Sequence, residues 1–276
     1  MTSESGYVLG TDDEEVARLG LQHAVWRPRA TAAWQRAGFS RGQTIVDLGC
    51  GPGYATLDLA EIVGPEGRVV AIDQSRRFLD VLRARVRALA LRHVEVLELN
   101  LDEAPLPRLS ADGIWTRWVY SFVRGPGRLL ERAVRLLKPG GTIVMHEYAD
   151  YGAWQTSPRS AEFERFVAEV MKSWRDAGGE PDIARELPRW LEELGCEVRS
   201  LSPLVEAARP GDHFWEWPTA FVASGTRRLV ELGRMSEAEA QAVVGAYRVS
   251  SRAAGAFQLT PTVLEIIAVS RGGDRT

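Results

Sequence analysis

The chain has 276 residues, of which 45% are hydrophobic and 26% charged, as in a globular protein large enough to bury a sizeable core. Its net charge of -3 gives no basic field for a nucleic acid, and its two cysteines, Cys50 and Cys196, suit neither a disulfide framework nor a metal site. The first fifteen residues are polar and acidic and no apolar run is of membrane-spanning length, so we expect a soluble, cytoplasmic protein.

Residues 44 to about 150 alternate predicted strands with predicted helices. In chain order they are strand 44–48, helix 54–63, strand 68–73, helix 76–91, strand 94–99, strand 113–116, helix 127–138 and strand 142–146. Ser75 is a plausible N-cap for the helix at 76–91, and Lys138-Pro139-Gly140-Gly141 is a stop signal for the helix at 127–138. This alternation predicts a doubly wound, mostly parallel sheet.

The second half of the chain is less regular. We predict helices over 160–176 and 183–194, a strand near 196–202 and a closing strand over 263–269. Residues 211–257, between these two strands, are rich in aromatic residues and helical signals.

A glycine-rich turn, Asp47-Leu48-Gly49-Cys50-Gly51-Pro52-Gly53, follows the first strand, and the second strand ends at Asp73. Glycines let the backbone pass close beneath a ligand, and an acid at the tip of the next strand can accept two hydrogen bonds from a ribose diol. A dinucleotide fold needs its third glycine at position 54, where Tyr54 stands, and no Gly-Lys-Ser/Thr follows to make a P-loop. The turn therefore indicates an adenosine-type cofactor site of another kind.

The spacing Asp-x-Gly-x-Gly-x-Gly resembles the first motif of the class I S-adenosylmethionine-dependent methyltransferases. Two later segments fit the same family in order: 111–119 resembles its fourth strand, and 129–141 its helix and Lys-Pro-Gly-Gly turn before strand five. The resemblance covers about 44–150. It implies an α/β, Rossmann-like, doubly wound sheet of seven mostly parallel strands, with S-adenosyl-L-methionine as cofactor and S-adenosyl-L-homocysteine as product.

The resemblance also implies which residues meet the cofactor. Asp73 would bind the ribose hydroxyls with Gln74 beside the adenine, and Gly49 and Gly51 would back the amino-acid moiety. The residues near its amine and methylthio group would be Arg117, Trp118 and Val119.

The acceptor for the adenine amine has two alternatives in the sequence. Counting from strand 94–99 gives Asn100, whereas counting back from Leu106-Pro107 gives Asp102, with Leu101 between them. We favour Asp102, because a carboxylate is the better acceptor for an exocyclic amine; the alternative for Asp102 is a solvated loop acid.

The N-terminal segment, with Tyr7 and Gln22, looks like the leader of small-molecule tailoring methyltransferases from bacterial natural-product pathways, where it folds over the site. Tyr7 would then close the cofactor pocket and Gln22 would bond near the methionine end; otherwise this is an amphipathic helix packed on the core. The last two strands of this family normally form a hairpin, so 211–257 reads as an insertion. We therefore predict an N-terminal helical lid over 1–40, a core over 41–210 and 258–276, and an inserted helical cap over 211–257.

Candidate residues for chemistry and acceptor binding follow the last parallel strand and the start of the insertion. Transfer of a sulfonium methyl needs a general base only for some acceptors, and His146 and His213 are the candidates for base or orienting group. The expected acceptor pocket is lined by His146, Tyr148, Tyr151, Trp154 and Trp217. Aromatic walls suit a flat or bulky apolar acceptor. The alternative is that the histidines are structural and the tryptophans are core.

The sequence thus favours methyl transfer to the O, N or C atom of a small, aromatic or bulky apolar metabolite, in secondary metabolism. A protein or nucleic-acid substrate is disfavoured by the charge and by the lack of an Asn/Asp-Pro-Pro-Tyr/Phe motif. The alternative of another class is a protein of the same fold that binds S-adenosylmethionine for cyclase, rearrangement or regulatory purposes. We expect a monomer or homodimer without nucleic-acid, membrane or metal partners, since no close-set ligand pattern appears.

Overall fold

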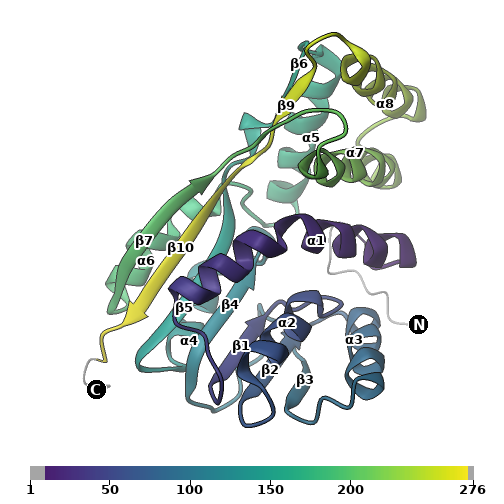
Figure 1. Ribbon diagram of the computed structural model, residues 1–276. Coiled ribbons are helices and arrows are strands. Elements are labelled where there is room, and N and C mark those ends of the chain that lie inside the picture. Colours follow the sequence, from purple (N-terminus) through teal and green to yellow (C-terminus); the bar gives the residue numbers. More distant parts are fainter. Residues whose placement is uncertain (1–9, 273–276) are drawn as a thin grey trace.

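A seven-stranded sheet in the order β3-β2-β1-β4-β5-β10-β7 forms the centre of the molecule (Figure 1). The computed structural model describes residues 10–272. The strands are β1 (Thr44–Leu48), β2 (Arg68–Asp73), β3 (Val94–Glu98), β4 (Ala111–Arg117), β5 (Leu137–Asp150), β7 (Cys196–Leu204) and β10 (Thr262–Ser270). Neighbours from β3 to β5 pair in parallel, and β10 runs antiparallel to both β5 and β7. The predicted doubly wound, mostly parallel, seven-stranded sheet is confirmed.

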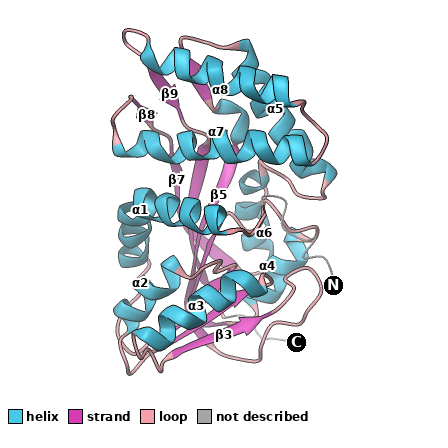
Figure 2. Ribbon diagram, turned by 90° about the vertical axis from the view of Figure 1, so that its right-hand side faces the viewer, coloured by secondary structure: helices cyan, strands magenta, loops and turns pink. Residues whose placement is uncertain are grey.

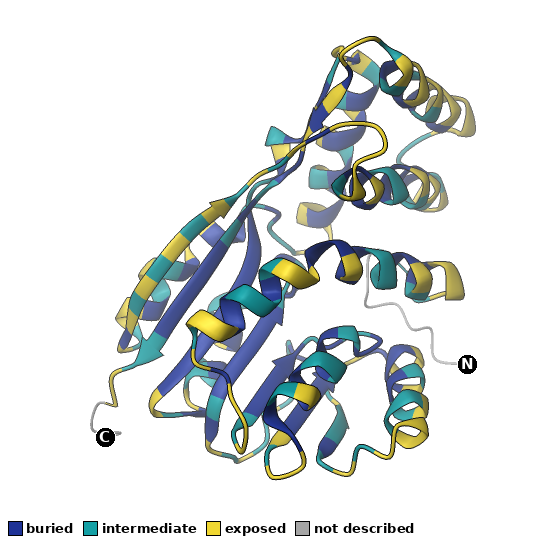
Figure 3. Ribbon diagram, viewed as in Figure 1, coloured by how far each residue is buried: buried dark blue, intermediate teal, exposed yellow. Residues whose placement is uncertain are grey.

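Helices cover both faces of this sheet, because its central strands are apolar on both sides (Figure 3). The helices of one face are α1 (Asp13–Arg36), α2 (Tyr54–Val63) and α3 (Arg76–Ala88), and those of the other are α4 (Pro126–Val134) and α6 (Leu187–Glu193), after the 3-10 turn η2 (Ile183–Arg185). Trp34 of α1 packs with Ile45 on the first face. Of the helices between residues 10 and 272, none is both long and apolar enough to cross a membrane.

A second layer, which we call the cap, lies beyond α1 at the carboxyl ends of the strands (Figure 2). It contains α5 (Ala161–Asp176), α7 (His213–Glu231) and α8 (Glu237–Arg252), with a small sheet of β6 (Gln155–Ser157), β9 (Phe257–Leu259) and β8 (Ala207–Ala208). The 3-10 turn η1 (Tyr151–Ala153) connects β5 to it. Helices α7 and α8 occupy the predicted insertion, but α5 and β6, which precede it in sequence, pack with them.

Strand β5 differs most from its predicted bounds. Helix α4 ends at Val134 rather than at residue 138, and the Lys-Pro-Gly-Gly segment lies inside β5 as an irregularity. The register with β4 passes from Ala111 opposite Leu137 to Gly113 opposite Thr142, which absorbs the extra residues. At its other end β5 continues to Asp150, so His146 lies within the strand and not at its end.

Gln258 of β9 is the polar centre of the cap. Its side chain is fully buried, and its Oε1 accepts hydrogen bonds from Trp154 Nε1 at 3.1 Å and from Tyr247 Oη at 3.2 Å. Its Nε2 donates to the carbonyl oxygen of Trp215 at 3.5 Å. One amide thus joins β9 to the residue that follows η1, to α7 and to α8.

We expect Gln258→Leu to lower the free energy of unfolding by about 1–3 kcal/mol, because the buried Trp154 N–H would lose its acceptor. Urea unfolding followed by circular dichroism measures this. The matched control is Gln155→Leu on the neighbouring strand β6, where the side chain is exposed. Equal effects of the two changes would contradict the assigned role of Gln258.

Candidate functional site

A cavity of about 640 Å³ lies under α1 at the carboxyl ends of β1, β2 and β4, within the size range of small-molecule sites. The structure brings together at its wall every predicted cofactor residue that it describes: Gln22, Gly49, Gly51, Asp73, Gln74, Asn100, Leu101, Asp102, Arg117, Trp118 and Val119. Tyr7 lies outside the described residues. We call this the cofactor cavity.

Asp73 is held at the end of β2 by backbone donors on both sides. Its Oδ2 accepts from the Gly51 amide at 2.8 Å, and its Oδ1 accepts from the Ser75 amide at 2.8 Å. Burial raises the pKa of this carboxyl, and the backbone donors oppose that rise. The Gln74 amide also interacts with this carboxylate. A carboxylate offers about four acceptor positions, so Asp73 keeps acceptor capacity for the hydroxyls of a ribose.

Asn100 and Asp102 both lie at the wall of the cofactor cavity, and the backbone fixes both. Asn100 Oδ1 accepts from the Asp102 amide at 2.9 Å. Asp102 Oδ1 accepts from the amides of Arg124 and Gly125, at 2.7 and 3.2 Å, just before α4. The preference for Asp102 as the adenine acceptor stays a prediction, since either side chain is placed to reach a ligand.

Asp47 lies at the inner end of the cofactor cavity, on β1. Its Oδ2 accepts from Thr56 Oγ1 at 2.6 Å. Burial raises its pKa to about 7, while the positive charge of Arg117 opposes the rise. The cavity therefore contains a carboxyl with a raised pKa and, without direct contact between them, a guanidinium.

The loop that follows β4 is shaped by the carboxylate of Glu147. The backbone amides of Val119, Tyr120 and Ser121 donate to it at 2.8, 3.1 and 3.4 Å, and Ser121 Oγ donates at 3.2 Å. Burial raises the pKa of Glu147 to about 7, with these donors opposing. Trp118 directly precedes them and has a φ of +53°, a left-handed conformation that costs a tryptophan of order 1–3 kcal/mol.

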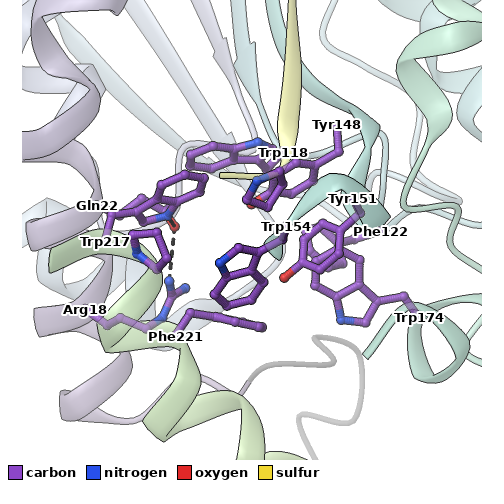
Figure 4. Close-up of a pocket in the computed structure, with 12 residues that line it drawn as sticks. Arg18, Gln22, Trp118, Phe122, Tyr148, Tyr151, Trp154, Trp174, Trp217 and Phe221 are labelled. Atoms are coloured by element: carbon purple, nitrogen blue, oxygen red, sulfur yellow. Dashed lines mark hydrogen bonds between the residues drawn. The ribbon is translucent and has the colours of Figure 1, made fainter. Parts of the chain in front are cut away.

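A second, smaller cavity of about 30 Å³ adjoins the first beneath the cap, and we call it the aromatic chamber (Figure 4). Its lining residues are Arg18, Gln22, Trp118, Phe122, Tyr148, Tyr151, Trp154, Trp174, Trp217, Pro218, Phe221 and Pro261. Four of the five predicted acceptor residues are among them, all except His146. Gln22, Trp118, Phe122 and Trp174 line both cavities. The chamber has room for about two water molecules, so an acceptor ring requires its walls to move.

The rings of the chamber form a parallel stack with Trp118 in the middle. Its ring lies 5.3 Å from that of Tyr148 at 15° and 5.4 Å from that of Trp217 at 8°. Gln22 Oε1 accepts from Trp217 Nε1 at 3.0 Å and from Arg18 Nη1 at 3.0 Å. Gln22 therefore connects α1, which covers the cofactor cavity, to α7 of the cap.

Neither predicted catalytic histidine lines the cofactor cavity or the aromatic chamber. His146 is fully buried, its Nε2 lies 3.1 Å from Glu265 Oε2, and its ring meets that of Trp115 edge-on at 4.9 Å. Burial lowers its pKa, and Glu265 opposes that change. His213 is exposed at the first turn of α7. The geometry therefore does not support a role as a base for either histidine. For His146 the reason is its position inside β5, where its ring is buried.

Several lining residues were missed by the sequence analysis, among them His23, Tyr54, Phe78 and Trp174. Tyr54 carried a signal, since it replaces the glycine of a dinucleotide fold. Its Oη donates to the Val16 carbonyl at 3.1 Å, which anchors α1 over the turn. Trp174 comes from the far end of α5 and carried no signal, because only tertiary packing brings it to the cavity.

Comparison with known proteins agrees with this geometry. The family profile of the methyltransferase domain matches residues 46–145. A demethylmenaquinone methyltransferase of Lactococcus lactis is 35% identical over 46% of this chain and 49% of its own length. One of Listeria welshimeri is 32% identical over 67% of this chain and 74% of its own. The chain spans about half the length of several of the curated relatives that it matches.

Among solved structures, the geranyl diphosphate C-methyltransferase of Streptomyces coelicolor superposes with a TM-score of 0.57 at 19% identity. The superposition covers 96% of this chain and 87% of that one. At this identity the likeness supports the fold alone.

Two alanine substitutions in the glycine turn separate ligand binding from packing. Both Gly51 and Gly53 have positive φ, so each change costs roughly 1–2 kcal/mol of backbone strain. A Cβ at Gly53 would lie 2.2 Å from Leu82 Cδ1, whereas a Cβ at Gly51 meets no atom within 4 Å. We expect G53A to cost more stability and G51A to cost more affinity for S-adenosylhomocysteine. Urea unfolding and calorimetric titration measure the two effects; equal losses in both assays would contradict this division.

The raised pKa of Asp47 predicts a pH-dependent difference from Asp47→Asn. The native state holds the Asp47 proton up to about pH 7, while the unfolded chain releases it near 3.8, so the wild type loses stability as the pH rises from about 3.8 to about 7 and loses no more above that. Relative to wild type, D47N should gain about 1–3 kcal/mol of unfolding free energy between pH 5 and pH 8. Urea unfolding without ligand at both pH values tests this. Parallel pH profiles for the two proteins would show that Asp47 is ionised throughout.

Proposed function

Because the chain belongs to the class I S-adenosylmethionine-dependent methyltransferases, we propose that it transfers a methyl group from this cofactor to a small organic molecule. The observation that carries the proposal is the junction of its two cavities. The cofactor cavity holds the acid at the end of β2 and the glycine turn, and it meets the aromatic chamber at Trp118. A donor site and an acceptor site in contact are what a group transfer requires.

The residues of the cofactor cavity fit the chemical groups of S-adenosylmethionine. Asp73 has acceptor positions for the ribose hydroxyls, and Asn100 and Asp102 offer acceptors for adenine. Asp47 and Arg117 bring a carboxyl and a guanidinium to the same cavity. When bound, the cofactor supplies a methyl group on a positively charged sulfur that is its own leaving group. The protein's contribution is then to orient the acceptor and to exclude water.

The aromatic chamber supports an aromatic or bulky apolar acceptor, as in the small-molecule tailoring enzymes that the N-terminal segment resembles. Most of its lining side chains are aromatic, with Arg18 and Gln22 as polar neighbours, and aromatic walls suit a flat ligand. Within the described chain this lining contributes no carboxylate and no imidazole. The acceptor atom we favour is therefore one that reacts without a strong base from the protein, such as an amine or an electron-rich ring carbon.

Replacement of Asp73 tests the cofactor site. We expect Asp73→Ala to weaken binding of S-adenosylmethionine and S-adenosylhomocysteine by roughly 10- to 100-fold, because two hydrogen bonds to a charged group are lost. Calorimetric titration gives the affinities, and mass spectrometry of a panel of aromatic metabolites incubated with the wild type reports the gain of one methyl group. Asp80→Ala, on the exposed side of α3, is the control and should bind normally.

Each other result has a distinct meaning. Failure of the wild type to bind either compound would overturn the proposal. Tight binding with no methylated product from any acceptor would favour the alternative, a protein that uses the same cofactor site for cyclisation, rearrangement or regulation.

A further inference from the structure

Within residues 10–272, no carboxylate is in contact with the buried guanidinium of Arg117. Arg117 ends β4 and lines the cofactor cavity. Its Nη2 donates to His23 Nδ1 at 3.2 Å, and its Nη1 is shielded from solvent with no hydrogen-bond partner among residues 10–272. Trp118 and Trp115 place their ring centroids 5.3 and 5.8 Å from its Cζ.

This environment disfavours the charge that it contains. Burial lowers the pKa of Arg117 to about 10, and the nearby Asp47 opposes the change without touching the guanidinium. Buried charges in proteins are as a rule paired and hydrogen-bonded, since an uncompensated one is costly. An anion brought into the cavity by a ligand would complete the site.

The guanidinium is nevertheless held in one place from two helices. A guanidinium only donates, so His23 Nδ1 accepts and the His23 proton resides on Nε2. Nε2 lies 3.0 Å from Asp58 Oδ2 of α2, which also accepts from Arg27 Nε at 2.9 Å. Burial lowers the pKa of His23, in keeping with a neutral ring. The Asp58–His23 pair thus orients Arg117 at the cavity wall before any ligand binds.

We propose that Arg117 binds the α-carboxylate of the cofactor's methionine moiety, an inference that rests on the proposed function. S-adenosylmethionine carries one anionic group, this carboxylate, beside two cationic ones. Arg117 and Asp47 both line this cavity, and a guanidinium and a carboxyl there match the carboxylate and the ammonium of an amino acid. Arginine suits a carboxylate because its planar fork can donate two parallel hydrogen bonds.

The test compares S-adenosylmethionine with decarboxylated S-adenosylmethionine, which differs from it only by that carboxylate. Calorimetric titration is done with the full-length wild type and with Arg117→Gln, and circular dichroism checks that the variant is folded. We expect R117Q to weaken S-adenosylmethionine by about 10- to 100-fold and to change the decarboxylated compound by less than about twofold, as for loss of a charged hydrogen bond. Arg117→Lys keeps the charge without the fork, and we expect a smaller loss for S-adenosylmethionine alone.

The outcomes separate this proposal from the proposed function. Equal weakening of both ligands by R117Q would overturn it, because the effect would then be on the cavity as a whole. If R117Q binds both compounds as tightly as the wild type does, the proposal is also overturned. The carboxylate of an acceptor molecule would then be the candidate ligand of Arg117. If the wild type binds neither compound, the proposed function fails, and this inference fails with it.

Discussion

Four donors converge on the buried carboxylate of Glu147, and the shape of both cavities depends on that convergence. The loop after β4 leaves the sheet with three successive backbone amides that have no strand partner, and a single side chain from β5 accepts all of them. This is what maintains the left-handed conformation of Trp118 and keeps its indole between the cofactor cavity and the aromatic chamber. Because its oxygens are occupied by the main chain, Glu147 acts on the site through the loop rather than on a ligand.

Helix α1 is the wall that the two cavities share. It contributes Leu19, Gln22 and His23 to one and Arg18 and Gln22 to the other. On one side Tyr54 fastens it to the glycine turn, and on the other Gln22 bonds it to Trp217 of the cap. A displacement of this helix therefore alters both cavities together. Ligand binding in one cavity is in this way coupled to the shape of the other.

The sequence predicts where the proposed cofactor residues lie in the fold, but it predicts the positions of the proposed acceptor residues only in part, for a physical reason. Gly49, Asp73 and Arg117 each follow a parallel strand, and parallel strands bring their carboxyl ends to one edge of the sheet whatever covers them. His146 was misplaced because the extra residues of the Lys-Pro-Gly-Gly segment are absorbed inside β5, which then continues past the expected end. The cap's use of α5, and with it Trp174, depends on packing between distant segments that no local pattern records.

The position of β10 has a consequence for the way the chain folds as it is synthesised. This strand lies between β5 and β7, yet it follows the whole cap in sequence. Until it emerges, β5 and β7 each present an unpaired edge, so the nascent sheet has an open slot where backbone groups of another chain could pair. Closing that slot requires contacts of long sequence separation, which form slowly. The inserted cap thus lengthens the interval in which a newly made molecule depends on protection from aggregation.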